Sequence, residues 1–215
     1  MLQGQGSSLP IDQLEIIVKL FGRSNKKIYK RHLRWTDYFV KNNIYNIEKN
    51  YSLYPSRTQW NNMTVYDKES HKFVDIWEDV HSVHDYEMKD IYRIDYKFLR
   101  QQYTKVTEDV TREYGLEKYG ISDIWYNYYK KGQYQIPHKH LGPYNDNPPG
   151  GLSAIHYMIF DPKVHSTTHF TDPNIKPLRV RSGDIVFFPD DLEHYVPKSE
   201  TDKPRLTVAF TVSKH

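Results

Sequence analysis

The final ninety-five residues of the chain constrain its fold most strongly. From Ile121 onward, short stretches rich in β-branched and aromatic residues alternate with turns that contain Gly, Pro and Asp, which is typical of a sandwich or barrel. Eight such strands suit a jelly roll. The expected strands span Ile121–Tyr129, Gln135–His140, Leu152–Phe160, Thr167–Phe170, Leu178–Val180, Asp184–Phe188, His194–Val196 and Arg205–Val212.

The first 120 residues carry a different pattern. Leu14–Leu20 is rich in β-branched residues and predicts a strand, and the basic run from Lys26 to Arg34 predicts a helix that continues to about Lys41. Apolar residues at intervals of three and four predict a second helix within Tyr86–Tyr114, ended by Gly115 or Gly120. We therefore expect one domain over residues 1–215: a helix-rich support (1–120) packed on a β core (121–215).

Composition narrows the function classes. The 30 basic and 27 acidic residues are mixed along the chain and leave a net charge of +3, which does not favour nucleic acid as a partner. The sequence has no cysteine, so any metal must be bound by histidine and oxygen ligands. The first residues do not have the layout of a secretory signal, and no apolar run is long enough for a membrane span, so we expect a cytoplasmic protein. Pairing of exposed strands is a route to a homodimer.

Three histidines have the spacing of a metal site. His138 and His140 occupy positions i and i+2, which project from the same face of a strand, and His194 follows a mostly apolar strand further along the chain. Arg205 comes eleven residues after His194. A single histidine of this kind is more often a surface residue, but the pair together with His194 predicts a common site.

Other histidines nearby are less suitable ligands. His156 alternates with Tyr157 on its strand, so the two side chains face opposite sides. His165 and His169 fall in or next to predicted turns and are expected to be loop or rim residues.

Five sequence segments, taken in order, resemble those of the 2-oxoglutarate- and iron(II)-dependent oxygenases, and most closely those of the prolyl-hydroxylase-like branch. They are Trp125-Tyr-Asn-Tyr-Tyr-Lys-Lys-Gly132, His138-Lys-His140, Leu152-Ser-Ala-Ile-His-Tyr-Met158, Gly183-Asp-Ile-Val-Phe-Phe-Pro189 with His194, and Arg205-Leu-Thr-Val-Ala-Phe210. The resemblance implies a double-stranded β-helix, the cupin-like form of the jelly roll. It also implies a non-haem iron dioxygenase that hydroxylates a substrate with O₂ and converts 2-oxoglutarate to succinate and CO₂.

The resemblance also assigns roles to individual residues. His138, His140 and His194 would bind the iron, which leaves neighbouring coordination positions for the keto acid and O₂. Arg205 would pair with the distal carboxylate of 2-oxoglutarate, and the hydroxyls of Tyr157 and Tyr128 would add contacts to it.

The sequence departs from the family at one ligand. The family usually has His-x-Asp or His-x-Glu where this chain has His138-Lys139-His140. Three explanations remain open: a three-histidine iron site, which we favour; an oxygen ligand from Asp146 in the following loop; or a site that binds metal without turnover.

Two alternatives to the oxygenase share the same histidines. One is a cupin-like metal-binding module, and the other is a metalloenzyme that does not use 2-oxoglutarate. Arg205 distinguishes the oxygenase from a metal-binding module, because a purely structural metal site does not need a neighbouring cation. The substrate, peptidyl or small-molecule, is not specified by the sequence, and the loop Gly142–Gly151 is expected to form the rim or lid of the pocket.

Overall fold

A computed structural model describes residues 28–33, 37–53, 63–67, 72–76, 80–84, 94–140 and 150–214. Its main feature is a six-stranded antiparallel sheet in the order β1-β9-β7-β11-β5-β4. These strands span Tyr29–His32 (β1), Asp184–Pro189 (β9), Leu152–Ile159 (β7), Arg205–Lys214 (β11), Tyr119–Tyr129 (β5) and His81–His84 (β4). A second sheet, in the order β6-β10-β8, consists of Gln135–His138 (β6), His194–Val196 (β10) and His169–Phe170 (β8).

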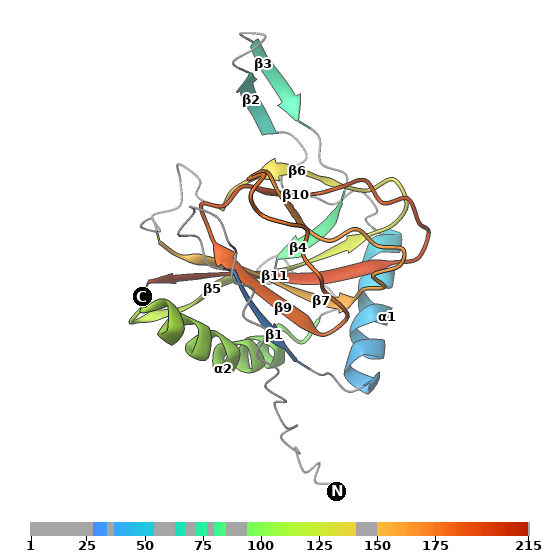
Figure 1. Ribbon diagram of the computed structural model, residues 1–215. Helices are drawn as coiled ribbons and strands as arrows, with labels where there is room; N and C mark the ends of the chain where they lie inside the picture. The colour runs from blue at the N-terminus through green and yellow to red at the C-terminus, as the bar shows by residue number, and fades with distance from the viewer. Residues whose placement is uncertain are drawn as a thin grey trace, which may run out of the picture.

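Two helices accompany these sheets, α1 (Asp37–Leu53) and α2 (Tyr96–Tyr114), and β2 (Met63–Asp67) pairs with β3 (Lys72–Ile76) as a hairpin. Figure 1 shows the helices on one side of the large sheet and β6 and β10 on the other. This is the expected mostly β architecture of a double-stranded β-helix, and the predicted fold class is confirmed.

Helix α2 has clear end signals and one apolar face. The Asp95 side chain accepts a hydrogen bond from the Phe98 backbone N–H (2.9 Å), and Gly115 ends the helix in the left-handed conformation (φ 71°). Leu99 and Tyr103 lie on the buried face, and the Tyr103 ring stacks on Phe210 of β11 with 4.7 Å between centroids. The predicted helix is therefore present, beginning at Tyr96 within the predicted range Tyr86–Tyr114.

The long central strands separate two apolar clusters. On β11, Leu206, Val208 and Phe210 pack in the cluster that α2 covers, whereas Ala209 packs in the cluster between the two sheets. On β5, Trp125 belongs with Ala209, since these two residues are paired in the register. Alternation along β5 and β11 thus fixes which side chains reach the space between the sheets.

The structure corrects two predictions about secondary structure. The basic run Lys26–Arg34 is not helical where it is described, because Tyr29–His32 forms β1 and pairs antiparallel with β9, more than 150 residues later. Leu178–Val180 is a connection instead of a strand. The predicted strand Leu14–Leu20 lies outside the described residues. Among the described residues, no helix is long and apolar enough to cross a membrane.

Candidate metal and co-substrate site

The three predicted histidines meet at the small sheet. Antiparallel pairing of β6 and β10 sets His194 directly opposite His138, and His140 follows two residues after the end of β6. One ring nitrogen from each histidine lies within 4.8 Å of those of the other two, and His140 Nε2 is 3.3 Å from His194 Nε2. In the described part of the chain, this group contains histidines alone and no carboxylate.

Backbone carbonyls orient two of the rings. His138 Nδ1 lies 2.8 Å from the Ile136 carbonyl oxygen, and His194 Nδ1 lies 3.0 Å from that of Leu192. A carbonyl oxygen only accepts, so each Nδ1 carries the proton and each Nε2 keeps a lone pair for a metal ion. The sequence could not reveal this arrangement, because both acceptors are backbone atoms.

Burial keeps these two imidazoles neutral. Burial, followed by the neighbouring His138, lowers the pKa of His194 to about 3. Burial also lowers the pKa of His138. Aromatic rings supply the apolar surroundings: Phe188 lies 4.8 Å from the His194 ring, and Trp125 lies 5.3 Å from the His140 ring, centroid to centroid. Neutral imidazole is the form that binds a metal ion.

Arg205 is buried, and no described residue serves as its counter-ion. It is 3% exposed, and its Nε and Nη1 atoms have no hydrogen-bond partner among the described residues. Its guanidinium carbon lies 4.5 Å from the centroid of the Tyr129 ring and 5.6 Å from that of Tyr157. Stacking on two rings offsets only part of the cost of burying a cation, so the unpaired N–H groups fit an anionic ligand.

Strand β5 links the histidines to Arg205. Trp125, Asn127 and Tyr129 share one face of this strand; Trp125 contacts His140, and Tyr129 contacts Arg205. These two contacts are four residues apart, or ~13 Å along the strand. Between them lies Asn127, 5% exposed, whose Oδ1 has no partner in the described structure. The space between the sheets therefore has nitrogen ligands at one end and a cation at the other.

The two predicted tyrosines have different places. Tyr157 faces the same side as Arg205, and its hydroxyl oxygen accepts a hydrogen bond from the Thr168 backbone N–H at 3.2 Å. Tyr128 does not reach Arg205; it faces the helices, and its hydroxyl donates to Glu48 of α1 at 3.1 Å. Tyr129 takes the place expected for Tyr128, because Tyr129 and Arg205 are register partners.

Tyr129 and Asn127 lie on the same face of β5 as Trp125, towards Arg205, and the sequence reasoning did not select them. The run Trp125 to Tyr129 contains the alternation that separates them from Tyr128, but alternation alone does not tell which set faces the pocket. Pairing of β5 with β11 determines that Tyr129, and not Tyr128, lies beside Arg205. The Tyr129 hydroxyl also donates to Gln135 Oε1 at the start of β6, which holds the ring under Arg205.

The remaining histidines lie outside the three-histidine group. His156 faces the helix layer, as predicted, and its Nδ1 lies 2.8 Å from the Tyr103 hydroxyl. His165 lies in a loop, as predicted, but it is only 8% exposed: its Nδ1 accepts from Asp161 N at 2.9 Å, and its Nε2 lies 3.1 Å from the Lys203 carbonyl oxygen. His169 is half-buried on β8, where it contacts Tyr195. Asp146 and most of the loop Gly142–Gly151 lie outside the described residues.

Comparison with known proteins supports the resemblance seen in the sequence. Residues 123–211 match a family model described as a putative 2OG-Fe(II) oxygenase. This segment contains every residue discussed for the site and runs from β5 to β11. No curated protein matches the sequence.

Solved structures share the fold at low sequence identity. A viral collagen prolyl hydroxylase from Paramecium bursaria Chlorella virus-1, in complex with 2OG, has a TM-score of 0.58 and 12% identity and aligns over 87% of this chain and 96% of its own. A Pseudomonas putida prolyl-4-hydroxylase has a TM-score of 0.58 and 9% identity, over 89% and 94%. HygX from Streptomyces hygroscopicus, with nickel and 2-oxoglutarate bound, has a TM-score of 0.55 and 12% identity, over 87% and 82%.

Proposed function

We propose roles for individual side chains of this chain, whose residues 123–211 place it in the family of 2-oxoglutarate- and iron(II)-dependent oxygenases. The chain is a non-haem iron dioxygenase that uses O₂ and 2-oxoglutarate and releases succinate and CO₂. In our proposal His138, His140 and His194 bind the iron. Arg205 binds the distal carboxylate of 2-oxoglutarate, with Tyr157 and Tyr129 at its sides.

The metal ligands fit the ion they would hold. Three imidazoles, two of them fixed by carbonyl oxygens and kept neutral by burial, would form a nitrogen site suited to iron(II), and three protein ligands would leave further coordination positions for 2-oxoglutarate and O₂. Compared with a site of two histidines and one carboxylate, the charge of the metal site is more positive by one. When bound, iron with 2-oxoglutarate supplies the oxidising chemistry that replaces a substrate C–H bond with C–OH.

The chain's own residues position the co-substrate. The N–H groups of Arg205 at Nε and Nη1 have no partner among the described residues and can donate to an anionic ligand, and the Tyr129 and Tyr157 rings contact the guanidinium from the strands on either side of β11. The Asn127 amide lies between the histidines and Arg205, and we propose that it hydrogen-bonds the co-substrate chain or a water molecule held beside it. Trp125 and Phe188 exclude water around the histidines.

One observation carries this proposal: a buried guanidinium that has no counter-ion in the described part of the chain shares an interior with a three-histidine group. A cupin-like metal clip would need the histidines but would leave Arg205 as an unexplained buried cation. A metalloenzyme independent of 2-oxoglutarate would need another anion at Arg205, and the family match favours 2-oxoglutarate.

The substrate is proposed at the level of class. The neighbours named as prolyl hydroxylases support a peptidyl substrate, and HygX, also solved with hygromycin B bound, supports a small molecule. Pools of proline-containing peptides and of hydroxylated small molecules should be compared with purified, iron-loaded enzyme. Succinate formed above the rate seen without substrate identifies the class.

The experiment that tests the function measures conversion of 2-oxoglutarate to succinate by nuclear magnetic resonance. We expect conversion that needs both iron(II) and O₂, and we expect it to vanish in His194→Ala. The control His169→Ala removes a histidine outside the three-histidine group and should retain conversion. Tight iron binding without succinate formation under any substrate pool would contradict the proposal and favour the metal-binding module.

We also propose a cytoplasmic location, which fits a chain that needs iron in its reduced state, since the cytosol is a reducing compartment. A homodimer remains a proposal that light scattering of the purified chain tests. Cell fractionation tests the location.

A further inference from the structure

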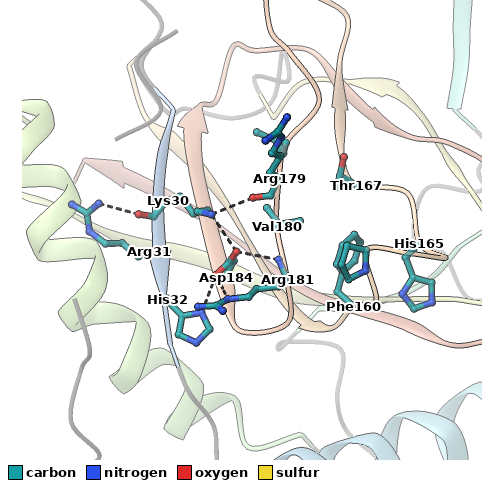
Figure 2. Close-up of a pocket in the computed structure, with 12 residues that line it drawn as sticks. Lys30, Arg31, His32, Phe160, His165, Thr167, Arg179, Val180, Arg181 and Asp184 are labelled. Atoms are coloured by element: carbon teal, nitrogen blue, oxygen red, sulfur yellow. Dashed lines mark hydrogen bonds and ion pairs between the residues drawn. The ribbon is translucent and has the colours of Figure 1, made fainter. Parts of the chain in front are cut away.

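A cavity of about 520 Å³ lies at the opposite end of β9 from the histidines. Its wall includes Asp184, the first residue of β9, whereas Phe188 near the other end of that strand contacts His194. The four-residue separation corresponds to ~13 Å. Figure 2 shows Lys30, Arg181 and Asp184 grouped on one side of this cavity and Phe160, Thr167 and His165 on the other.

The cavity is rich in cations. Lys30, Arg179 and Arg181 line it together with one buried carboxylate, Asp184. Arg31 also lines the cavity, but its guanidinium pairs with Glu113 of α2. The three cations that remain against one carboxylate leave an excess of two positive charges, close to the +3 of the whole chain.

Asp184 pairs with two of these cations, Lys30 and Arg181, and leaves Arg179 without an acidic partner among the described residues. Its carboxylate lies 2.8 Å from His32 Nδ1, 3.5 Å from Lys30 Nζ and 4.0 Å from Arg181 Nε, and it also accepts a hydrogen bond from the Arg181 backbone N–H at 3.0 Å. One carboxylate shared by two cations balances a single positive charge, and its hydrogen bond with the Arg181 backbone also fixes the turn at the base of the cavity. Arg179 is exposed, and the described structure gives its guanidinium no acidic partner.

The cavity wall is preformed. Ser182 Oγ accepts from Phe160 N at 2.9 Å and donates to the Phe160 carbonyl oxygen at 3.0 Å. The turn is also tied to β7 by a hydrogen bond from Gly183 N to the Tyr157 carbonyl oxygen (2.7 Å), and to the chain after β1 by one from Leu33 N to the Gly183 carbonyl oxygen (2.8 Å). A site held by its own backbone loses little entropy when a ligand binds.

The rest of the lining is apolar. Phe160, Pro162, Leu178 and Val180 form a non-polar surface beside the cations, and Thr167 offers a hydroxyl. The ligand that this combination suits has an anionic head and an apolar body. Several cations around one head favour a phosphoryl group, which presents three acceptor oxygens, over a carboxylate, for which one arginine suffices.

We propose that this cavity binds a small phosphorylated molecule with an aromatic or apolar body. Its phosphoryl group lies against Arg179, Arg181 and Lys30, and its body lies on Phe160 and Leu178. The residues that line the cavity include neither the three-histidine group nor Arg205, and this inference does not depend on the function proposed for them.

The test uses phenyl phosphate as the probe, titrated into the full chain by isothermal calorimetry at about 0.1 M ionic strength. The variant Arg179→Gln/Arg181→Gln removes two cations from exposed side chains and keeps Lys30 and Asp184. The matched control, Arg112→Gln, removes an arginine that is exposed on α2. Arg205→Met tests whether the probe binds at the other site, and the melting temperature of each variant shows that it is folded.

We expect one phenyl phosphate per chain, with affinity reduced at least about tenfold in the double variant and unchanged in Arg112→Gln and Arg205→Met. Inorganic phosphate should bind several-fold more weakly, since it lacks the body. Unchanged affinity in the double variant, loss of binding in Arg205→Met, or an equal loss in Arg112→Gln would overturn the proposal. Inorganic phosphate binding as tightly as phenyl phosphate would overturn the role of the apolar wall.

Discussion

Substitution of Arg205 by methionine should separate folding from co-substrate binding. Methionine has a similar length, carries no charge and adapts its shape to the space left. In the ligand-free protein the guanidinium is buried with no carboxylate partner among the residues that the structure describes. This state costs several kcal/mol, of which stacking on Tyr129 offsets ~2 kcal/mol. The ligand-free variant should therefore unfold at the same temperature as the wild type or higher.

Co-substrate binding should change in the opposite direction. A charge-assisted pair with a carboxylate contributes roughly 1.5–3 kcal/mol, so its loss weakens 2-oxoglutarate binding by about 10- to 100-fold. At a concentration 100 times the wild-type Kd, the ligand stabilises the wild type by ~2.7 kcal/mol but a 100-fold weaker variant by only ~0.4 kcal/mol. For a chain of this size the Tm increases by about 5–10 °C and 1–2 °C, respectively.

The assay is thermal unfolding followed by tryptophan fluorescence, with manganese(II) in place of iron so that no turnover occurs. Arg112→Met, an exposed substitution on α2, serves as the control and should behave as the wild type. The reasoning is refuted if Arg205→Met keeps the full 2-oxoglutarate shift. It is also refuted if the ligand-free variant melts many degrees lower, since Arg205 would then be a structural residue.

Four further predictions concern other residues. His194→Ala should abolish the increase in Tm caused by manganese(II), whereas His169→Ala should retain it, as thermal unfolding will show. Burial, followed by the neighbouring His32, lowers the pKa of His156 to about 3, so the unfolded chain binds a proton that the folded chain rejects; this contribution to stability is complete above about pH 6.5 and is lost towards pH 3. Urea unfolding at pH 7 and pH 5 should show a loss larger by ~2 kcal/mol in the wild type than in His156→Gln, and equal losses would contradict the assignment. Gly183→Ala should lower stability by about 1–3 kcal/mol, because residue 183 has φ 90° and its Cβ would lie 2.7 Å from His32 Cε1; an unchanged urea midpoint would show that the turn can move. Phe210→Ala should lower the free energy of unfolding by about 3–5 kcal/mol, since this fully buried ring stacks on Tyr103, and a loss below 1 kcal/mol would contradict its place in the core.

The β core was predictable from the sequence because its signals are local. The strands from Tyr119 to Tyr129 and from Leu152 to Ile159 are runs of aromatic and β-branched residues bounded by turns, and they appear within two residues of the predicted limits. The His138 and His140 pair was predictable for the same reason, since a spacing of two places both side chains on one face.

The missed features depend on contacts between distant parts of the chain. The charges of residues 29–32 favour a helix, but these residues form a strand because they pair with β9. A local sequence pattern does not indicate a pairing partner so far along the chain. The choice between Tyr128 and Tyr129 likewise depends on which of them is paired with Arg205. The sequence shows that neighbouring side chains of the strand face opposite sides, but not which side faces Arg205.

The cationic cavity was hidden for a related reason. Lys30 lies in β1, whereas Arg179 and Arg181 precede β9, so the three cations come together only when these two segments pair. In the sequence, Lys30 belongs to the basic run Lys26–Arg34 and the two arginines to a separate stretch, and each taken alone is typical of solvated surface.

The central claim, that three histidines and Arg205 together hold iron and 2-oxoglutarate, is tested most directly by an anaerobic titration. The metal-free protein is titrated with iron(II) and then with 2-oxoglutarate, and the visible charge-transfer band of the keto acid bound to iron is recorded. We predict one iron per chain, a band in the wild type, no band in His140→Ala, and a band in Arg205→Met only at much higher 2-oxoglutarate concentration. Iron binding without any band in the wild type, or an unchanged band in His140→Ala, would contradict the three-histidine account.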